Sequence, residues 1–323
     1  MQIVRYEKKY CTLWNNVVDK SRNATFLFYR SYMDYHEDRI EDASLLIFDD
    51  NNHCVALFPA SVNKEPQIVY SHAGLTYGGI LLNQTTRTVA IKEIFNHIAK
   101  YYICDGYKQL IYKPIPYIYH KTPAQEDLYW LFRADAALTS RNISTTIDLN
   151  SPILFTTLRE RKINKARKEN LTVKQDNMYL AEYWKILSNV LKTRHGVAPV
   201  HTIDEIVKLS DLFPQNIKLY TIHNELNDLL AGILAYITTE VVHVQYIAAS
   251  ENGRNAGALD LLFSELIKMI KENSSHRFFD FGISTENGGK ILNEGLIFQK
   301  EGFGGHGVCY DSYMVNLQKL ADL

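Results

Sequence analysis

The chain has 323 residues, with 35 lysines and arginines against 36 aspartates and glutamates, so its net charge is -1. Hydrophobic residues make up 46% and charged residues 22% of the sequence, which is typical of globular proteins. This length predicts about two domains, each large enough to bury its own core. The balanced charge argues against a dedicated nucleic-acid-binding protein but leaves room for a local basic patch.

No run of about 18 apolar residues occurs, so we expect no membrane-spanning helix. The first ten residues alternate charged and apolar side chains, so we also expect no signal peptide. The four cysteines lie far apart and include no Cys-x-x-Cys pair, which argues against a zinc knuckle or a disulfide framework. We therefore predict a cytoplasmic protein without a metal site, and both a monomer and a dimer remain open.

The first half of the chain contains a recognisable series of strands and one long helix. The strands are expected at 45–48, 55–59, 68–70 and 109–112. Before the last strand, a glycine-containing segment leads into a helix with apolar residues at helical spacing. One face of that helix carries Ile91, Ile94, Phe95, Ile98 and Tyr102.

The second half repeats this order. Its strands are expected at 219–222, 231–236, 241–247 and 278–281. A loop over 252–257 precedes a helix whose apolar face carries Leu259, Leu262, Phe263, Leu266 and Ile270. Leu46 and Leu219 are 173 residues apart, and Ile94 and Leu266 are 172 residues apart. Such similar separations predict one α/β (α+β) domain type used twice, with domains at 1–150 and 151–323; two unrelated α/β halves are the alternative.

Several helices are marked near and beyond the join, which we place at Asp148–Pro152. A basic helix is expected over 158–168, with a thin apolar stripe made of Leu158, Ile163 and Ala166. Thr122 and Gln125 match a capping box, with proline at the first helical position, and Thr202 and Glu205 match another.

A strand, a loop and a helix with glycine in the loop form a candidate anion site. The first turn of a helix offers unpaired N–H groups and the positive end of the helix dipole to a phosphate. Arg254, which precedes Gly257 at this helix start, adds a guanidinium that can bind phosphate oxygens in pairs. A plain strand-to-helix turn is the alternative interpretation.

Five segments of the chain resemble a known family, and together they span most of residues 40–316. They are 112–120, 126–132, 161–168, 279–285 and 293–304. The last one reads Asn293-Glu-Gly-Leu-Ile-Phe-Gln-Lys-Glu-Gly-Phe-Gly304, and its Asn-Gly-Leu stretch and Lys-x-Gly-Phe-Gly ending are the most specific features. The chain resembles a tandem GNAT (acyl-CoA N-acyltransferase) fold, and more narrowly the Fem-type aminoacyltransferases and their bacterial relatives.

This resemblance implies two GNAT-like domains, each with a mixed, mostly antiparallel sheet flanked by helices. It implies transfer of an acyl or aminoacyl group to an amine on a small molecule or a cell-envelope precursor. Acyl-CoA, such as acetyl-CoA, is the donor in GNAT proteins, whereas Fem-type relatives use aminoacyl-tRNA. Leu259 stands where the GNAT phosphate loop has its second small residue, which weakens the case for acyl-CoA. The basic helix at 159–168 is the candidate tRNA contact.

The resemblance also implies direct attack by the amine, which requires a base near the amine and a proton donor for the leaving group. Catalytic candidates lie at the end of the 278–281 strand and after the glycines of 302–305; they are Asp280, Ser284, Glu286, His306 and Tyr310. Strand alternation places Asp280 on the face opposite Phe279 and Phe281. Donor-binding candidates are Arg254, Asn255, Ala256, Gly257, Ala258, Tyr246, Ile247, Asn293 and Lys300.

Three hypotheses remain open at this point. The first is an acyl-CoA-dependent N-acyltransferase. The second is an aminoacyl-tRNA-dependent transferase on the same scaffold. The third is a non-catalytic binding module of GNAT fold, which Leu259 and the lack of a decisive catalytic pair keep in consideration.

Overall fold

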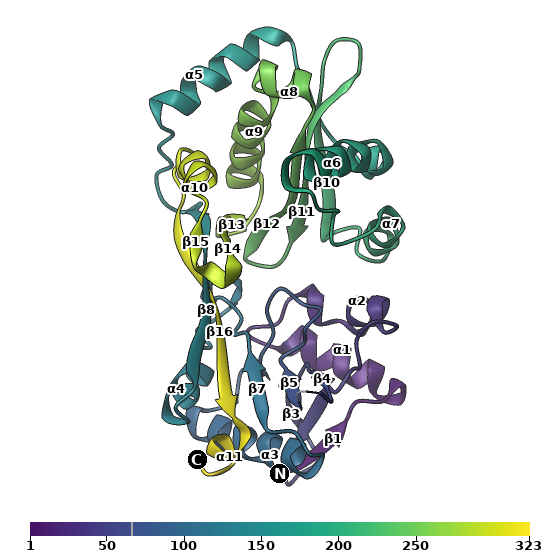
Figure 1. The fold of residues 1–323 in the computed structure, drawn as a ribbon, viewed down its shortest axis with the longest axis vertical. Helices are drawn as coiled ribbons and strands as arrows, with labels where there is room; N and C mark the ends of the chain where they lie inside the picture. Colours follow the sequence, from purple (N-terminus) through teal and green to yellow (C-terminus); the bar gives the residue numbers. More distant parts are fainter. Residues whose placement is uncertain (66) are drawn as a thin grey trace. The chain divides into compact units, whose positions relative to one another are not determined.

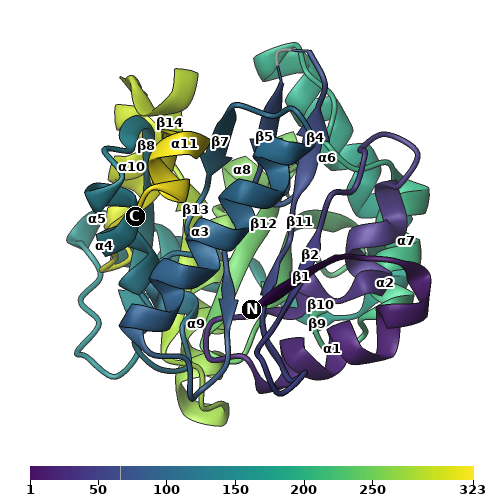
Figure 2. The same ribbon diagram turned by 90° about the horizontal axis from the view of Figure 1, so that it is seen from below.

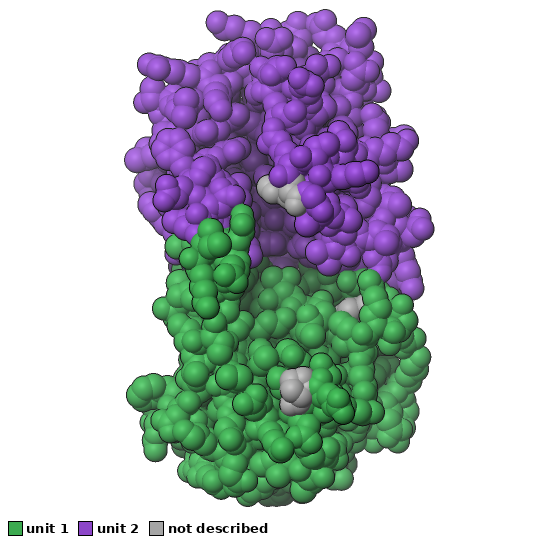
Figure 3. All heavy atoms as spheres, viewed as in Figure 1, with its two compact units in different colours: residues 1–143, 285–291, 309–323 green, residues 144–284, 292–308 purple. Residues whose placement is uncertain are grey.

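The computed structural model describes residues 1–65 and 67–323, and the side chains of these residues other than His36 and His195. The chain forms two compact units, shown in green and purple in Figure 3. Unit 1 comprises residues 1–143, 285–291 and 309–323, and unit 2 comprises residues 144–284 and 292–308. The boundaries fall within β8 (Ala137–Asp148), β15 (Ile291–Leu292) and β16 (His306–Asn316), and just before β14 (Thr285–Glu286).

Unit 1 contains a four-stranded antiparallel sheet and a second strand group with a parallel pair. The antiparallel sheet consists, in spatial order, of β1 (Gln2–Arg5), β2 (Leu45–Phe48), β3 (Cys54–Phe58) and β6 (Leu81–Leu82). The second group consists of β4 (Ser61–Asn63), β5 (Ile68–Tyr70), β7 (Gln109–Tyr112) and the 309–316 part of β16. Strands β5 and β7 run parallel, whereas β4 and β16 pair antiparallel with them.

The main helix of unit 1 is α3 (Thr88–Cys104), which buries the apolar face predicted from helical spacing. Its residues Ile91, Ile94 and Phe95 form one core cluster with Leu45 of β2 and Leu110 of β7. Figure 2 shows α3 with α11 (Leu317–Ala321) nearby, and the two helices are in contact. The other α-helices of this unit are α1 (Cys11–Lys20), α2 (Arg30–Met33) and α4 (Glu126–Arg133).

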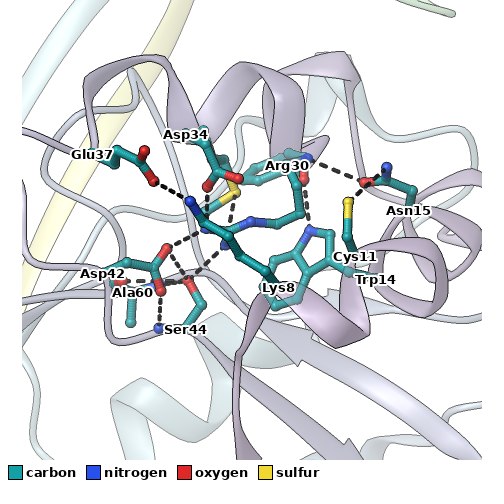
Figure 4. A network of polar contacts seen from close by, with 12 residues as sticks. Lys8, Cys11, Trp14, Asn15, Arg30, Asp34, Glu37, Asp42, Ser44 and Ala60 are labelled. Carbon is teal, nitrogen blue, oxygen red and sulfur yellow. Dashed lines mark hydrogen bonds and ion pairs between the residues drawn. The ribbon is translucent and has the colours of Figure 1, made fainter.

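A buried arginine organises the polar interior of unit 1 (Figure 4). The Arg30 guanidinium lies 3.7 Å from the ring centroid of Tyr6 and pairs with Asp34 and with Asp42, the latter at 2.7 Å. Burial by itself lowers the pKa of Arg30, but the two carboxylates outweigh it and raise that pKa. A buried charge is tolerated when it is paired and hydrogen-bonded in this way, so the network is a structural element of unit 1.

Unit 2 is built on a mixed sheet with one parallel pair. Its strands, in spatial order, are the 144–148 part of β8, β13 (Phe278–Ile283), β12 (Val241–Ala249), β11 (Leu229–Ile237), β10 (Ile217–His223) and β9 (Thr172–Gln175). Strands β12 and β13 are parallel, and the other neighbours are antiparallel. Both units therefore have mixed, mostly antiparallel sheets flanked by helices, which confirms the predicted fold class.

Helices cover both faces of the unit 2 sheet (Figure 1). On one face, α9 (Ala258–Asn273) contributes Leu262, Phe263 and Leu266 to a core with Val244 and Phe279. On the other face, α6 (Leu180–His195) packs so closely that a Cβ on Gly232 of β11 would lie 2.6 Å from the Tyr183 ring. The remaining α-helices are α5 (Thr157–Ala166), α7 (Ile203–Leu212), α8 (Glu251–Ala256) and α10 (Glu294–Glu301).

The structure confirms one predicted helix start and corrects three local predictions. The capping box of Thr202 and Glu205 is present at α7. Helix α4, however, begins at Glu126, after the predicted cap at Thr122. The predicted loop over 252–257 is largely the short helix α8. In α5, Leu158 is 43% exposed and Arg159 is buried in its place, because Arg159 forms an ion pair with Asp260 of α9.

Among residues 1–65 and 67–323, no helix combines the length and the apolar character needed to cross a membrane.

Candidate active site

Strands β12 and β13 pair over a short ladder and then separate. The ladder runs from Val241 and Phe278 to His243 and Asp280. Beyond it, β12 continues to Ala249 along β11, with a register shift between Val244 and Tyr246. A bulge of this kind bends a strand and increases its local twist. We call residues 244–249 of β12 and 281–283 of β13 the fork.

A glycine shapes the β13 side of the fork. Gly282 has a φ of +79°, a conformation that side-chain-bearing L-residues rarely adopt. A Cβ at this position would lie 3.5 Å from both the Val244 carbonyl oxygen and His243 Cε1. The pairing of β13 with β8 also shifts register between Asp280 and Ile283. The regular strand conformation of β13 is therefore interrupted directly after the last rung of the ladder.

That last rung consists of an acid and a base. His243 Nδ1 lies 2.7 Å from Asp280 Oδ2. Asp280 is fully buried and also accepts hydrogen bonds from the hydroxyl groups of Ser144 and Thr146, at 2.5 and 2.7 Å. Burial by itself raises the pKa of Asp280, but these three partners, and His243 above all, hold that pKa below its usual value.

An ionised Asp280 determines the orientation and tautomer of His243. A carboxylate only accepts hydrogen bonds, so Nδ1 of the neutral imidazole donates its hydrogen to Asp280. Nε2 then carries the lone pair, as in other histidines that serve as bases beside a buried aspartate. The His243 side chain is 14% exposed. Asp280 and His243 thus form a pair that can accept a proton at His243 Nε2.

Alternation places this pair on the sheet face opposite α9. Val242, Val244, Phe279 and Phe281 belong to the core cluster that contains α9. His243 and Asp280 alternate with these residues along their strands and therefore point to the other face.

A buried lysine lies at the end of β13. Lys300 of α10 donates from Nζ to the carbonyl oxygens of Gly282 and Ile283, both at 2.8 Å. Burial lowers the pKa of Lys300 to about 8, and the charge of Asp280 acts in the opposite direction. Asn293 caps α10 with its side chain and donates its backbone N–H to the Ser284 carbonyl oxygen at 2.9 Å. Ser284 is buried, and within the described part of the chain its hydroxyl has no hydrogen-bond partner.

The predicted donor segment at 254–258 forms the junction of α8 and α9. Arg254 donates to the Ala249 carbonyl oxygen at 3.0 Å, and Lys165 of α5 donates to the Asn255 carbonyl oxygen at 3.2 Å. Gly257 has a φ of +72°, and a Cβ there would lie 3.4 Å from the Lys162 carbonyl oxygen. Helix α5 therefore packs against the junction at the glycine that sequence analysis assigns to phosphate binding.

The two alanines of this segment contribute to packing. Ala258 is fully buried in the core cluster, and Ala256 packs against the same cluster. Leu259, the bulky residue of the predicted phosphate loop, is partly buried against that core as well. The side chain of Leu259 therefore contributes to the packing of α9 against the core.

The other predicted site residues have separate surroundings. Tyr246 hydrogen-bonds to His201 Nδ1 at 2.7 Å and packs edge-on against Trp184 of α6. Ile247 packs partly buried against the α9 core. His306 is exposed.

Two of the predicted catalytic residues belong to unit 1. Glu286 is exposed in β14, and the Tyr310 hydroxyl lies 2.9 Å from the Tyr119 hydroxyl. The structure thus gathers Asp280, Ser284, Asn293 and Lys300 around β13 and distributes the other candidates elsewhere.

The glycines at 302–305 are explained by close packing. A Cβ on Gly302 would lie 3.0 Å from Arg159 Cγ, and one on Gly305 would lie 2.6 Å from Thr145 Cγ2. Gly304 has a φ of +82° and lies against the Leu154 backbone. These contacts join the segment to α5, β8 and the residues between them.

His243 was not among the site residues predicted from the sequence, although the strand that contains it was predicted. The available signal was one histidine among valines in Val241-Val-His-Val244. The parallel pairing that sets this histidine beside Asp280 joins residues 37 positions apart, and strand patterns do not specify such a pairing. Within residues 1–65 and 67–323, no group of three or more histidine, cysteine, aspartate or glutamate residues is placed to hold a metal ion.

Comparisons with known proteins agree with this architecture. Residues 157–287 match the family model described as an acetyltransferase (GNAT) domain. No curated protein matches the chain by sequence at a significant level. Among solved structures, FemX superposes with a TM-score of 0.70 at 11% identity, covering 100% of this chain and 99% of its own.

Two further solved structures are also similar over nearly the whole chain. L-PGS from Bacillus licheniformis has a TM-score of 0.59 at 14% identity, with 99% of this chain and 97% of its own covered. A tandem GNAT protein from the clavulanic acid biosynthesis pathway has a TM-score of 0.52 at 8% identity, with 98% of each chain covered. These findings confirm the tandem GNAT, Fem-like fold, and residues 157–287 match a GNAT acetyltransferase domain.

Proposed function

We propose that this tandem GNAT-fold acyltransferase transfers an acyl group from acyl-CoA to an amine by direct attack, with His243 as the general base. The observation that carries the proposal is the hydrogen-bonded pair of His243 and Asp280 on the last rung of the β12–β13 ladder. A base oriented by a buried carboxylate at the carboxyl end of the β12–β13 ladder is suited to remove a proton from a bound amine.

In this reaction the amine gives a proton to His243 Nε2, and its nitrogen forms a bond to the carbonyl carbon of the donor. Asp280 stabilises the imidazolium that results, because its carboxylate remains ionised in the folded protein. The carbon–sulfur bond then breaks, and the sulfur leaves as a thiolate. No covalent intermediate with the protein is needed. Backbone N–H groups along the fork segment of β12 are the proposed donors to the carbonyl oxygen.

The proposed donor-binding segment is 254–258, with Tyr246, Ile247 and Asn293 as further predicted contacts. Two features support a phosphate near this segment: the start of α9 and the exposed side chain of Arg254. The proposed acceptor is an amine on a small molecule or on a cell-envelope precursor, and the proposed location is the bacterial cytoplasm. Ser284, Glu286, His306 and Tyr310 stay predictions as catalytic residues.

A second candidate donor, aminoacyl-tRNA, is favoured by the surface of α5. The exposed cations of this helix and of the turn after it are Arg161, Lys162, Lys165, Arg167 and Lys168. Lys165 reaches the α8–α9 junction directly through its bond to the Asn255 carbonyl oxygen. A run of exposed cations beside the donor segment suits a polyanion, whose binding weakens steeply as salt increases.

The first experiment measures binding of CoA and acetyl-CoA by calorimetry, together with release of free thiol in the presence of a panel of amines. We expect binding by the wild type, weaker binding by Arg254→Ala, and thiol release that requires His243. A ligand that binds only the folded state also raises the melting temperature, which gives an independent readout.

The two donors are then separated by a direct comparison. If neither CoA nor acetyl-CoA binds, the acyl-CoA proposal is wrong, and binding of charged tRNA is measured at two salt concentrations. Replacing Lys162, Lys165 and Lys168 by glutamine should abolish tRNA binding and leave CoA binding unchanged. If the protein binds neither donor, the result would favour the hypothesis of a non-catalytic binding module.

A further inference from the structure

The backbone carbonyl groups at the end of β13 have no partner in the β12–β13 ladder. The ladder ends at Asp280, yet β13 continues through Gly282 and Ile283 to the buried Ser284. Backbone carbonyl groups that no neighbouring strand pairs need other hydrogen-bond partners.

Helix α10 and its cap supply these partners. Lys300 Nζ binds the carbonyl oxygens of Gly282 and Ile283, and the Asn293 N–H binds that of Ser284. Three successive carbonyl groups at the end of β13 therefore accept hydrogen bonds from a single segment, residues 293–300. The end of β13 is attached to α10 at the point where β13 separates from β12.

The Lys300 side chain is buried and makes two hydrogen bonds to the backbone. It is 6% exposed, and both of its hydrogen bonds have ordinary lengths of 2.8 Å. Burial of its ammonium is unfavourable, and the charge of Asp280 offsets part of that cost. Its Nζ is directed at the backbone oxygens of Gly282 and Ile283, whereas the sequence made Lys300 a donor-binding candidate.

We infer that Lys300 is a positioning residue for acyl transfer, which holds the end of β13 apart from β12 and thereby maintains the fork beside His243 and Asp280. This inference rests on the proposed function. A shorter or apolar side chain leaves the Gly282 and Ile283 carbonyl groups without their partner. Those groups then turn toward other donors, and the backbone around the reacting atoms moves.

The chain offers a matched control in Lys271 of α9. Lys271 Nζ also donates to two backbone carbonyl oxygens, those of Leu149 and Ser151, both at 2.8 Å. These bonds lie in the same unit but join α9 to the segment after β8. Lys271→Met therefore removes the same chemistry away from the fork.

The test compares Lys300→Met, Lys300→Arg and Lys271→Met by amide hydrogen exchange, donor affinity and steady-state kinetics. For Lys300→Met we expect faster exchange over 281–284 and 244–249 and about 100-fold lower kcat, with donor affinity changed much less. Lys300→Arg, which keeps charge and donors, should recover part of both. Lys271→Met should leave kcat and exchange at the fork as in the wild type.

Two results would overturn the inference. One is a folded Lys300→Met protein with wild-type exchange at the fork. The other is a loss confined to donor affinity, which would indicate a direct phosphate contact. If Lys300→Met does not fold, Lys300→Arg decides through the same exchange measurement. If the wild type lacks transferase activity, the proposed function fails, whereas the exchange comparison still reports whether Lys300 holds the fork.

Discussion

Each unit contains a parallel strand pair, and the two pairs differ at the end of the ladder and just beyond it. In unit 1, β5 and β7 pair from Ile68 and Gln109 to Tyr70 and Ile111. In unit 2, the ladder of β12 and β13 has the same length of three rungs. The third rung joins Tyr70 and Ile111 in unit 1, but His243 and Asp280 in unit 2.

Beyond the unit 1 ladder, hydrogen bonds join the ends of the two strands to each other and to a crossing loop. Ser71 N–H donates to the Ile111 carbonyl oxygen at 2.9 Å, and Lys113 N–H donates to Ser71 Oγ at 2.8 Å. Gly78 N–H then donates to the Lys113 carbonyl oxygen at 2.8 Å. A Cβ on Gly78 would lie 1.8 Å from the Ser71 carbonyl oxygen, so this loop crosses the strand ends in close contact.

One fold therefore accommodates both a packed strand end and an acid–base pair. In unit 1 the strand ends satisfy each other through Ser71, whereas in unit 2 Lys300 satisfies β13 from a helix. Function on a shared scaffold depends on such local differences. Substitutions in each unit, with controls in the same chain, can test this difference.

The most severe test is removal of the base in unit 2. His243→Ala should lower kcat by about 100- to 10,000-fold, because the amine then lacks its proton acceptor. Donor affinity should change little, and activity should be measured as thiol release across a pH series. His53→Ala, at an exposed histidine of unit 1, is the control and should behave as the wild type. Equal kcat values for His243→Ala and the control would exclude His243 as the base.

The closed strand end of unit 1 is tested at Gly78. An added methyl group collides with the Ser71 backbone, so Gly78→Ala should lower the free energy of unfolding by about 3 kcal/mol. The measurement is urea unfolding with a circular dichroism readout. Gly295→Ala is the matched control, because its Cβ meets open space except for Asn293 Oδ1 at 3.9 Å in α10. Comparable losses in both variants would show that the closure at Ser71 is looser than the contacts imply.

The two units also contain buried aspartates whose pKa values shift in opposite directions. Burial raises the pKa of Asp127 in unit 1 to about 6, although the hydrogen bond from the Tyr112 hydroxyl at 2.7 Å acts in the opposite direction. A raised pKa means that the folded state binds more protons than the unfolded state between about pH 4 and pH 6. The contribution of Asp127 to stability is therefore present at low pH and is lost as the pH rises through about 6.

Asp280 behaves in the reverse way. Its lowered pKa means that its contribution to stability is present at neutral pH and is lost as the pH falls. Unfolding free energies measured from pH 4 to pH 8 should change by up to about 3 kcal/mol through Asp127, and Asp127→Asn should remove that slope. Asp280→Asn should instead reduce stability at neutral pH. The same pH slope in Asp127→Asn and the wild type would contradict the assignment.

The mildest change concerns the start of α7 in unit 2. Thr202 and Glu205 form a complete capping box, so Thr202→Ala should lower the free energy of unfolding by about 1 kcal/mol. At α4 of unit 1, no side chain caps the helix, and Thr122→Ala should have a much smaller effect. Urea unfolding of both variants checks the pair. A larger loss at Thr122 would indicate that the chain before α4 contributes a contact of its own.

Local features of the chain were predictable because they depend on neighbouring residues. Helical spacing identified α3 and α9, and apolar runs identified most strands of both units. The repeated order of these elements was sufficient to predict one domain type used twice, and the resemblance carried by five segments implied that this type is GNAT-like. The cap at Thr122 was predicted wrongly, because the residues between it and Glu126 do not enter a helix and a capping motif alone does not start one.

By itself, the sequence determined the helices, the strands, their repetition and the candidates at the end of β13, since side-chain periodicity and capping act over a few residues. Only the tertiary structure decided which candidates act together. His243 meets Asp280 because β12 and β13 pair in parallel although α8 and α9 lie between them in the chain, and Lys300 meets β13 because α10 packs there. Such contacts depend on packing between distant segments, which local periodicity does not encode.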